Sequence, residues 1–292
     1  MKKLAIIITL AGLIGTPASA ADMAVKAPPP APAPVPTWTG FYGGIQFGGG
    51  WSDEAVNYSA NDPIAALLLN GALLGPGTGE QPAPNGYRIP QSGAVGGFET
   101  GYNWQAASNW LLGLEADFSF SGMSGRASGT SLFGTGVPTN LTQSTTAEQS
   151  TDWYGTVRGR AGWLATPNLL LFGTGGFAYG RVDGSATYII NGGGIGSGNG
   201  VVSFVCTNGV TCFTGSSSAI RTGWTAGGGA EWLLDQHWSA KIEYQFIDLG
   251  SETVRVTAVT LCGICGGTSL SSFNAAFHDR FNVVRLGLNY RF

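Results

Sequence analysis

Residues 284–292 read Val-Arg-Leu-Gly-Leu-Asn-Tyr-Arg-Phe, so apolar residues alternate with polar or small ones up to an aromatic end. Alternation with a period of two is typical of a β-strand that has one apolar and one polar face. The stretch therefore predicts a final amphipathic strand that closes on Tyr290 and Phe292. We expect further strands of the same kind upstream.

The composition restricts the class of protein that such strands can build. Only 11% of the residues are charged, about half the usual share, and 48 of the 292 are glycine. Beyond the first 20 residues no stretch is long and apolar enough for a membrane-spanning helix. Two classes remain: a glycine-rich soluble all-β protein, and a transmembrane barrel, because a sheet spans a bilayer only when it is closed.

The first 37 residues predict an export signal and a spacer. Lys2 and Lys3 precede an apolar run to Ile14 and a stretch of small residues, which is typical of a secretory signal peptide over 1–20 that is cleaved between Ala20 and Ala21. Residues 21–37 are rich in alanine and proline and predict an extended periplasmic lead-in to a barrel over 38–292. Cleavage leaves 12 basic against 17 acidic residues, so we expect no nucleic-acid partner.

Connection lengths distinguish the two classes. Three connections are tight, at 105–108, 165–168 and 234–237, and they alternate with four connections of about 30 to 40 residues. This alternation predicts an all-β, eight-stranded, antiparallel up-and-down transmembrane barrel with short periplasmic turns and long outer loops. The eight expected strands lie near 38–51, 93–104, 109–121, 153–164, 169–181, 220–233, 238–247 and 281–292.

Charged residues within these strands keep to one face. Where a strand has two charges, both occupy positions of the same parity, and the opposite parity is apolar or aromatic. A charge facing lipid near mid-membrane costs about 2–4 kcal/mol, so the charged face is expected to line the lumen. The strand at 169–181 is ambiguous, and the first strand is less informative. The predicted lumen charges are Glu99, Glu115, Asp117, Arg158, Arg160, Arg221, Glu231, Lys241, Glu243, Arg285 and Arg291.

Tryptophans fall near two levels of the expected strands, as interfacial aromatic girdles require. Three lie toward the outer ends, Trp51, Trp153 and Trp224. Six lie beside the expected periplasmic ends: Trp38, Trp104, Trp110, Trp163, Trp232 and Trp238.

Four stretches carry a family resemblance: WTGFYGGIQFGGGW at 38–51, WYGTVRGRAGWL at 153–164, LLLFGTGGFAYGRV at 169–182 and VVRLGLNYRF at 283–292. The chain resembles the small outer-membrane barrel proteins of alphaproteobacteria, the outer-membrane immunogenic or opacity-type porin-family proteins. The resemblance implies an outer-membrane location, surface exposure, contact with lipid and lipopolysaccharide, and insertion machinery that reads the end at Tyr290 and Phe292. The long first loop and the cysteines depart from the family pattern.

Two hypotheses for the lumen stay open. Side chains nearly fill the interior of an eight-stranded barrel, and near-balanced opposite charges in a narrow lumen are expected to pair. We therefore favour a salt-bridged plug over a narrow conduit for ions or small solutes. The inward glycines Gly223, Gly227 and Gly229 favour the conduit, because they leave room.

The expected outer loops hold a short helix and four cysteines. Asp62 as a cap, Pro63 at the first position and Gly75 past the end predict a helix that either folds over the barrel mouth or exposes its leucines to a partner. In an exported chain, disulfides are the default for Cys206, Cys212, Cys262 and Cys265, in any of three connectivities. Their spacing supports a metal site only weakly.

Catalytic candidates are few. His237 falls in a periplasmic turn, and His278 with Asp279 falls at the outer mouth, where no local motif supplies nucleophile, base and orienter together. We therefore expect no enzyme, no cofactor and no metal, and predict a structural and surface-interaction role with envelope or host proteins as possible partners of the loops. A narrow porin is the main alternative. A haem-binding receptor with His278 as ligand and a lipid-modifying enzyme come behind it.

Overall fold

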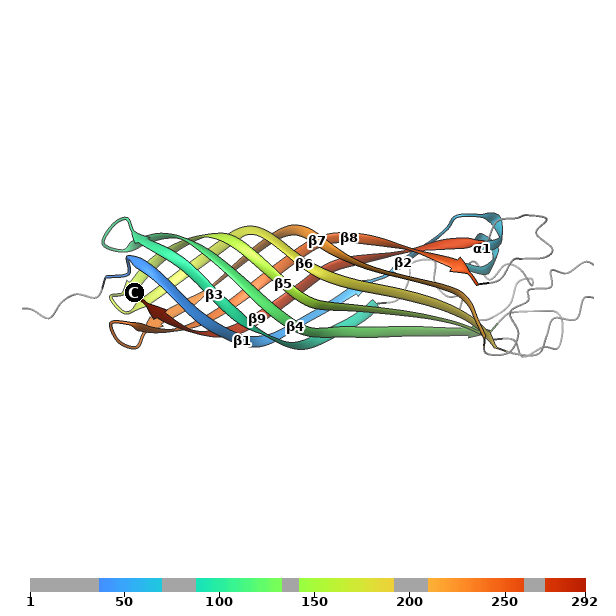
Figure 1. The fold of residues 1–292 in the computed structure, drawn as a ribbon, viewed down its shortest axis with the longest axis horizontal. Coiled ribbons are helices and arrows are strands. Elements are labelled where there is room, and N and C mark those ends of the chain that lie inside the picture. The colour runs from blue at the N-terminus through green and yellow to red at the C-terminus, as the bar shows by residue number, and fades with distance from the viewer. Residues whose placement is uncertain (1–36, 70–87, 133–141, 192–209, 260–270) are drawn as a thin grey trace, which may run out of the picture. The chain divides into compact units, whose positions relative to one another are not determined.

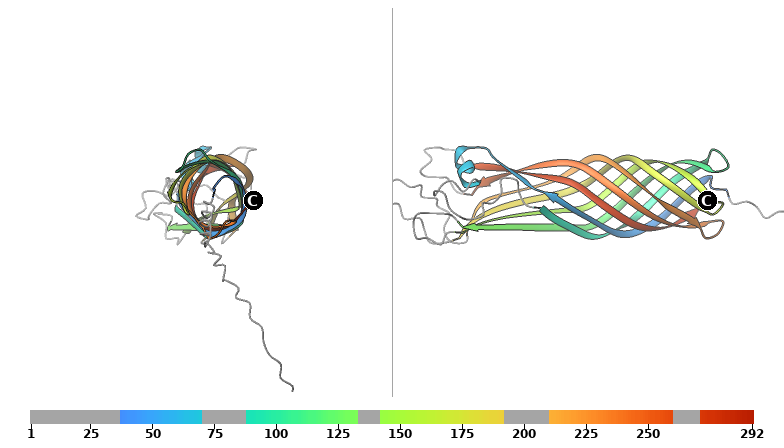
Figure 2. Two further views of the ribbon diagram at one scale, coloured as in Figure 1. Left: turned by 90° about the vertical axis from the view of Figure 1, so that its left-hand side faces the viewer. Right: turned by 180° about the vertical axis from the view of Figure 1, so that it is seen from behind.

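The computed structural model describes residues 37–69, 88–132, 142–191, 210–259 and 271–292. The strands are β1 (Gly40–Ala55), β2 (Asn57–Ala60), β3 (Arg88–Gln105), β4 (Trp110–Leu132), β5 (Thr142–Thr166), β6 (Leu169–Asn191), β7 (Val210–Leu233), β8 (Trp238–Ala258) and β9 (Ser272–Arg291). They form one antiparallel sheet in which β1 pairs with β3 and the strands from β3 to β9 follow in chain order, and the sheet closes because β1 also pairs with β9 (Figure 1; Figure 2, left).

Only Val56 separates β1 from β2, and both of these strands pair with β9. They are two parts of one strand, so the ring has eight strands. The seam between first and last strand runs from Tyr42 opposite Arg291 to Trp51 opposite Asn282. The predicted eight-stranded up-and-down barrel is confirmed.

The two ends of the barrel differ. At one end, called the turn end, lie the three tight connections, the start of β1 and the end of β9 (Figure 1, left). The turn after β7 is held by Asp235, whose carboxylate accepts hydrogen bonds from the backbone N–H groups of His237 and Trp238, both at 2.7 Å. These bonds lower the pKa of Asp235. The opposite end is called the loop end.

The strands extend further toward the loop end than predicted. For example, β4 continues from the expected end at 121 to Leu132, and β5 begins at Thr142 rather than at 153. The prediction treated these serine- and threonine-rich stretches as loops, and it was wrong about the outer strand ends. Cross-strand pairs hold them as a sheet, such as the ion pair of Arg126 with Glu148 at 2.9 Å. The stretches beyond the predicted outer ends are called the extension.

A bulge in β8 reverses which positions face inward. Gly250 adopts a φ of 89°, and the pairing of β8 with β9 shifts between Asp248 and Ser251. Before the bulge the odd-numbered residues are buried, and after it Glu252, Val254 and Val256 are buried instead. Parity therefore predicts the inward face of β8 only up to the bulge.

The predicted helix in the first loop is present as α1 (Pro63–Leu69). Asp62 caps it, since its Oδ1 accepts a hydrogen bond from the Ala65 N–H at 2.9 Å. Ala65 and Leu69 are buried in the apolar core of the extension, which favours a helix folded over the barrel mouth. No helix in the described ranges has the length and apolarity needed to cross a membrane.

Candidate functional site

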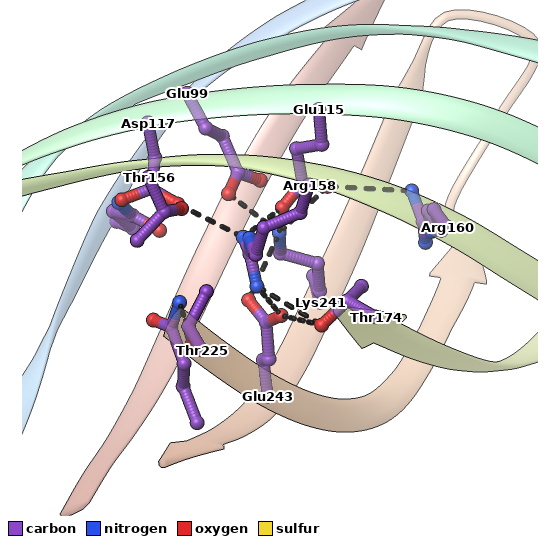
Figure 3. Close-up of polar contacts among 12 residues, drawn as sticks. Glu99, Glu115, Asp117, Thr156, Arg158, Arg160, Thr174, Thr225, Lys241 and Glu243 are labelled. Atoms are coloured by element: carbon purple, nitrogen blue, oxygen red, sulfur yellow. Dashed lines mark hydrogen bonds and ion pairs between the residues drawn. The ribbon is translucent and has the colours of Figure 1, made fainter. Parts of the chain in front are cut away.

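The barrel interior contains a cluster of nine buried charged side chains, called the charge network. Alternate positions of β3, β4, β5, β7, β8 and β9 point into the ring and bring these side chains together (Figure 3). None is more than 6% exposed. Five are carboxylates and four are cations: Glu99, Glu115, Asp117, Glu231 and Glu243 with Arg158, Arg160, Lys241 and Arg285.

Arg158 and Lys241 join most of the carboxylates. The Arg158 guanidinium bonds to Glu115 and Glu243, and it lies 2.9 Å from Asp117. Lys241 Nζ lies 2.5 Å from Glu99 and 3.2 Å from Glu115. Each of these two cations contacts two or more carboxylates. Every one of the four carboxylates that they contact therefore lies beside an opposite charge.

The rest of the network extends toward both ends. Toward the loop end, Arg285 pairs with Asp117 at 3.1 Å and with Glu243 at 2.9 Å. Toward the turn end, Arg160 pairs with Glu231, which also accepts a hydrogen bond from Ser239 at 2.6 Å.

Tyr42 is a member of the site that the sequence analysis did not name. Its hydroxyl donates to Glu115 Oε2 at 2.6 Å. A sequence signal existed, since Tyr42 shares the inward parity of Gln46 on the first strand.

The two other predicted lumen charges lie outside this network. Arg221 lies at the base of the extension, where it pairs with Glu252 at 3.1 Å. Arg291 lies at the turn end with its guanidinium 5.0 Å from the Trp38 ring. The predicted lumen charges therefore share the inward face but lie in three places. Nine form the charge network, Arg221 lies closer to the loop end, and Arg291 lies at the turn end.

An apolar layer lies at the turn end of the lumen, below the charge network. Trp38 is 1% exposed and donates from Nε1 to the Pro167 carbonyl at 3.0 Å. It was predicted to belong to an interfacial girdle, and that prediction was wrong because its even parity turns it into the barrel. The other members of this layer are Leu111, Leu164, Leu170, Phe172 and Leu233.

A second apolar layer covers the charge network toward the loop end. It includes Met123, Tyr154 and Phe281, and Tyr154 packs edge-on against Phe281 with ring centroids 5.4 Å apart. The ambiguous strand at 169–181 contributes inward residues to both apolar layers, Leu170 and Phe172 to the first and Ala178 to the second. Its inward face is largely apolar, so charge parity gave no signal there.

Above this lies a polar layer that the sequence did not predict. Gln91 donates to Gln149 at 2.9 Å, and Gln149 donates to Asp279 Oδ1 at 2.5 Å. Asp279 lies in the extension, next to the exposed Arg280. Burial, and then the nearby charge of Glu252, raise its pKa to about 7. The extension core, which contains Phe273 and Phe277, covers this layer in turn.

The inward glycines do not open the lumen. A Cβ on Gly229 would lie 2.0 Å from the carbonyl oxygen of Ile242, and one on Gly227 would lie 2.5 Å from that of Tyr244. The backbone of β8 therefore occupies the space that a side chain at either position would need. The glycines therefore allow β7 and β8 to approach closely within a tightly curved sheet.

The outward surface separates into an apolar band and a charged rim. Large exposed apolar side chains such as Phe47, Leu114 and Leu286 cover the band. Exposed ion pairs begin just beyond Trp51 and Trp153, at Arg88 with Asp53 and at Arg181 with Asp152. These pairs mark the level at which the surface leaves the apolar band.

Histidine placement weighs against the catalytic alternative. His278 and Asp279 are successive residues of β9, so their side chains point to opposite faces. Asp279 is buried and bonded to Gln149, while His278 is half-buried. Asp279 is therefore not placed to orient the His278 ring, as a hydrolytic dyad requires. His237 is exposed and stacks on Tyr290 with ring centroids 5.7 Å apart.

Other predicted sites are described only in part. Cys212 is buried in the extension core, whereas Cys206, Cys262 and Cys265 lie outside the described residues, as do Ala20 and Ala21. Tyr290 and Phe292 contact each other edge-on at the end of β9, with centroids 5.2 Å apart. Disulfide pairing, signal cleavage and the insertion signal stay predictions.

Comparison with known proteins identifies the family. A family described as "Outer membrane protein beta-barrel domain" matches residues 8–292. The chain belongs to this family. It is 31% identical to the 31 kDa outer-membrane immunogenic protein of Brucella melitensis over 293 residues, which covers 99% of this chain and 100% of the relative.

Two further likenesses are weaker. The 22 kDa outer membrane protein of Rhizobium leguminosarum bv. viciae is 25% identical over 66% of this chain and 64% of the relative. The solved structure of OprG from Pseudomonas aeruginosa aligns with a TM-score of 0.38 at 11% identity, over 87% of this chain and 96% of that chain.

The protein is therefore an outer-membrane β-barrel protein, as the resemblance implied. The apolar band faces outer-membrane lipid, and the turn end corresponds to the periplasmic side, where barrels of this class carry their short turns. The extension then stands on the extracellular side of the membrane.

Proposed function

We propose that this outer-membrane barrel is closed to ions and solutes and acts as a structural surface protein that holds an extracellular β-extension above the membrane. The observation that carries the proposal is the filling of the lumen. Two apolar layers enclose the charge network, and a further polar layer and the extension core follow. A conducting lumen needs a continuous hydrated path, whereas the charged groups here are buried and ion-paired.

The rival function is a narrow porin for ions or small solutes. It shares the barrel, the location and the inward charges, and differs only in whether the lumen holds a water path. Eight-stranded barrels have just enough interior for side chains to fill, whereas barrels of 16–18 strands leave an aqueous channel. Barrel size and the layered filling both favour the closed form.

Ion conductance of the refolded protein in a planar bilayer tests the proposal. Folding is checked first by the shift in gel mobility on boiling, and a wide porin in the same bilayer serves as the positive control. We expect no stepwise current from the wild-type protein. Stable steps whose size changes in Arg158→Gln but not in the exposed Arg126→Gln would overturn the proposal in favour of a narrow porin.

A further inference from the structure

A polar hollow of about 870 Å³ lies on the extension. Several of its lining residues have exposed side chains, among them Ser124, Arg126 and Glu148, so the hollow opens on the outer surface. It is called the serine hollow here. It is lined by Pro90 of β3 and by residues 124–126, 148–150, 183–185 and 216–218 of β4 to β7.

Strand register places hydroxyl groups in rows across the hollow. Ser124 lies opposite Ser150, which lies opposite Asp183, which lies opposite Ser218. Ser185 and Ser216 pair in a second row. Hydroxyls both donate and accept hydrogen bonds, and carboxylates accept them, so this surface matches the hydroxyl groups of a sugar.

Two arginines stand at this surface with bonding capacity left over. Arg126 bonds to Glu148 at 2.9 Å. Arg181 lies 3.7 Å from both Asp152 and Asp183, beyond hydrogen-bonding distance. The planar guanidinium has five N–H donors in a geometry that fits phosphate oxygens. The two arginines therefore offer donors to an anionic group on the ligand.

A row of contacting aromatic rings, called the aromatic ladder, lies below the hollow on the same side of the barrel. Phe118 stacks on Trp153 with centroids 5.5 Å apart, and Trp153 meets Tyr179 at 6.1 Å. Trp153 lies directly opposite Arg181 in the strand register. The ladder also includes Phe98, Phe120 and Phe177.

We propose that the serine hollow and the aromatic ladder together bind the phosphorylated sugar headgroup of an outer-leaflet glycolipid. The ladder lies at the interface, where aromatic rings sit at headgroup level. The hollow begins three residues further along β5, about 10 Å at the usual rise of a strand. A glycolipid beside the barrel then places its phosphates near Arg181 and Arg126 and its sugar hydroxyls against the serines. This inference uses the outer face alone and does not depend on whether the lumen conducts.

Binding of fluorescently labelled lipopolysaccharide to the refolded protein in dodecyl maltoside micelles tests the inference through fluorescence anisotropy. The test variant is Arg126→Gln with Arg181→Gln. The matched control is Arg88→Gln with Arg280→Gln, two exposed arginines that each pair with an aspartate at 2.9 Å outside the hollow. All four are surface groups, so folding is expected to persist, and the gel shift on boiling verifies it.

We expect the test variant to bind about tenfold more weakly or worse, because it loses two charge-assisted contacts, and the control to match the wild type. Ser185→Trp, which fills the hollow without changing charge, is expected to weaken binding equally. Lipid A without phosphates is expected to bind more weakly than intact lipid A.

Three outcomes would overturn the inference. The first is equal binding by the test variant, Ser185→Trp and wild type. The second is an equal loss in test and control variants, which indicates general charge attraction. The third is a wild-type dimer in native mass spectrometry that the test variant dissociates without any binding of lipopolysaccharide, since this assigns the face to a second copy of the chain. Conductance is measured separately, so either proposal can fail alone.

Discussion

The ammonium nitrogen of Lys241 lies 2.5 Å from Glu99 Oε2, although 142 residues separate the two in the sequence. Glu115 and Glu243 complete its surroundings at 3.2 and 3.4 Å (Figure 3). Carboxylate oxygens of these three glutamates lie within 4.8 Å of one another. Lys241 thus occupies the place at which three buried negative charges meet. Arg158 also pairs with Glu115 and Glu243, whereas the ion pair of Glu99 is made by Lys241.

Replacing Lys241 by Met is therefore expected to lower the free energy of unfolding by about 3–5 kcal/mol, because it leaves the buried Glu99 carboxylate without its cation. Guanidinium unfolding in detergent, followed by tryptophan fluorescence, measures the change. Arg88→Met is the control, since its exposed ion pair with Asp53 contributes no more than about 1 kcal/mol. Equal losses in both variants would contradict a special role for the network, and partial rescue by adding Glu99→Gln would support it.

The inward position of Trp38 can be tested by lipid quenching. Brominated lipids quench tryptophans that face the bilayer, and Trp38 is 1% exposed whereas Trp110 is 59% exposed on the outer surface. We expect Trp38→Phe to leave the quenched fraction of the fluorescence nearly unchanged or to raise it. Trp110→Phe is expected to reduce it. The reverse pattern would place Trp38 back in the interfacial girdle.

The close approach of β7 and β8 makes Gly229 sensitive to a single added methyl group. Its Cβ would meet the Ile242 carbonyl oxygen at 2.0 Å, so Gly229→Ala is expected to lose about 1–3 kcal/mol of stability or to fail in refolding. Gly175→Ala is the matched control, because its Cβ would have its nearest neighbour at 3.7 Å. The folded fraction on unboiled gels and the unfolding midpoint measure both. Equal tolerance would show that the strands separate easily.

Asp279 gives the extension a pH-dependent stability. Its pKa is raised from an ordinary value of 3.8 to about 7 by burial and by Glu252, so the ionised form is disfavoured in the folded protein. The penalty is absent below about pH 4 and is fully present above about pH 7. It amounts to about 4 kcal/mol at most, since one pKa unit corresponds to about 1.4 kcal/mol.

We therefore expect stability to fall between pH 5 and pH 8, and Asp279→Asn to flatten this dependence and to be the more stable protein at pH 8. Unfolding midpoints at the two pH values provide the measurement. Asp235→Asn serves as the control, because the pKa of Asp235 is lowered and its substitution is not expected to change this pH window. An unchanged slope in Asp279→Asn would refute the assignment.

The sequence predicted the membrane-spanning half of the structure because a physical penalty controls it. A charge at Arg158 or Glu243 cannot face lipid, so parity alone gives its direction. Parity also indicates the direction of Trp38, because its even position matches those of the inward Gln46 and Tyr42. There the expectation that tryptophans mark interfaces took precedence over parity and gave the wrong face.

The extension escaped prediction because no such penalty applies outside the bilayer. Its strands carry serine, threonine and glycine on the water-facing side, which is also the composition of loops. The inward position of Glu252 was hidden for a different reason. The bulge at Gly250 changes the inward parity of β8, and one residue in a left-handed conformation is not visible as a change in hydrophobic pattern.

The charge network also constrains when the barrel can form. Arg285 is on the last strand, and it bonds to Asp117 across 168 residues and to Glu243 across 42. Until β9 arrives, these acids lack one of their cations and β1 lacks its second neighbour. Contacts this distant in sequence make folding slow. The final step of assembly must therefore close the seam and neutralise the interior together, so a chain that stalls before its last 20 residues holds an open edge and unbalanced charge at the same time.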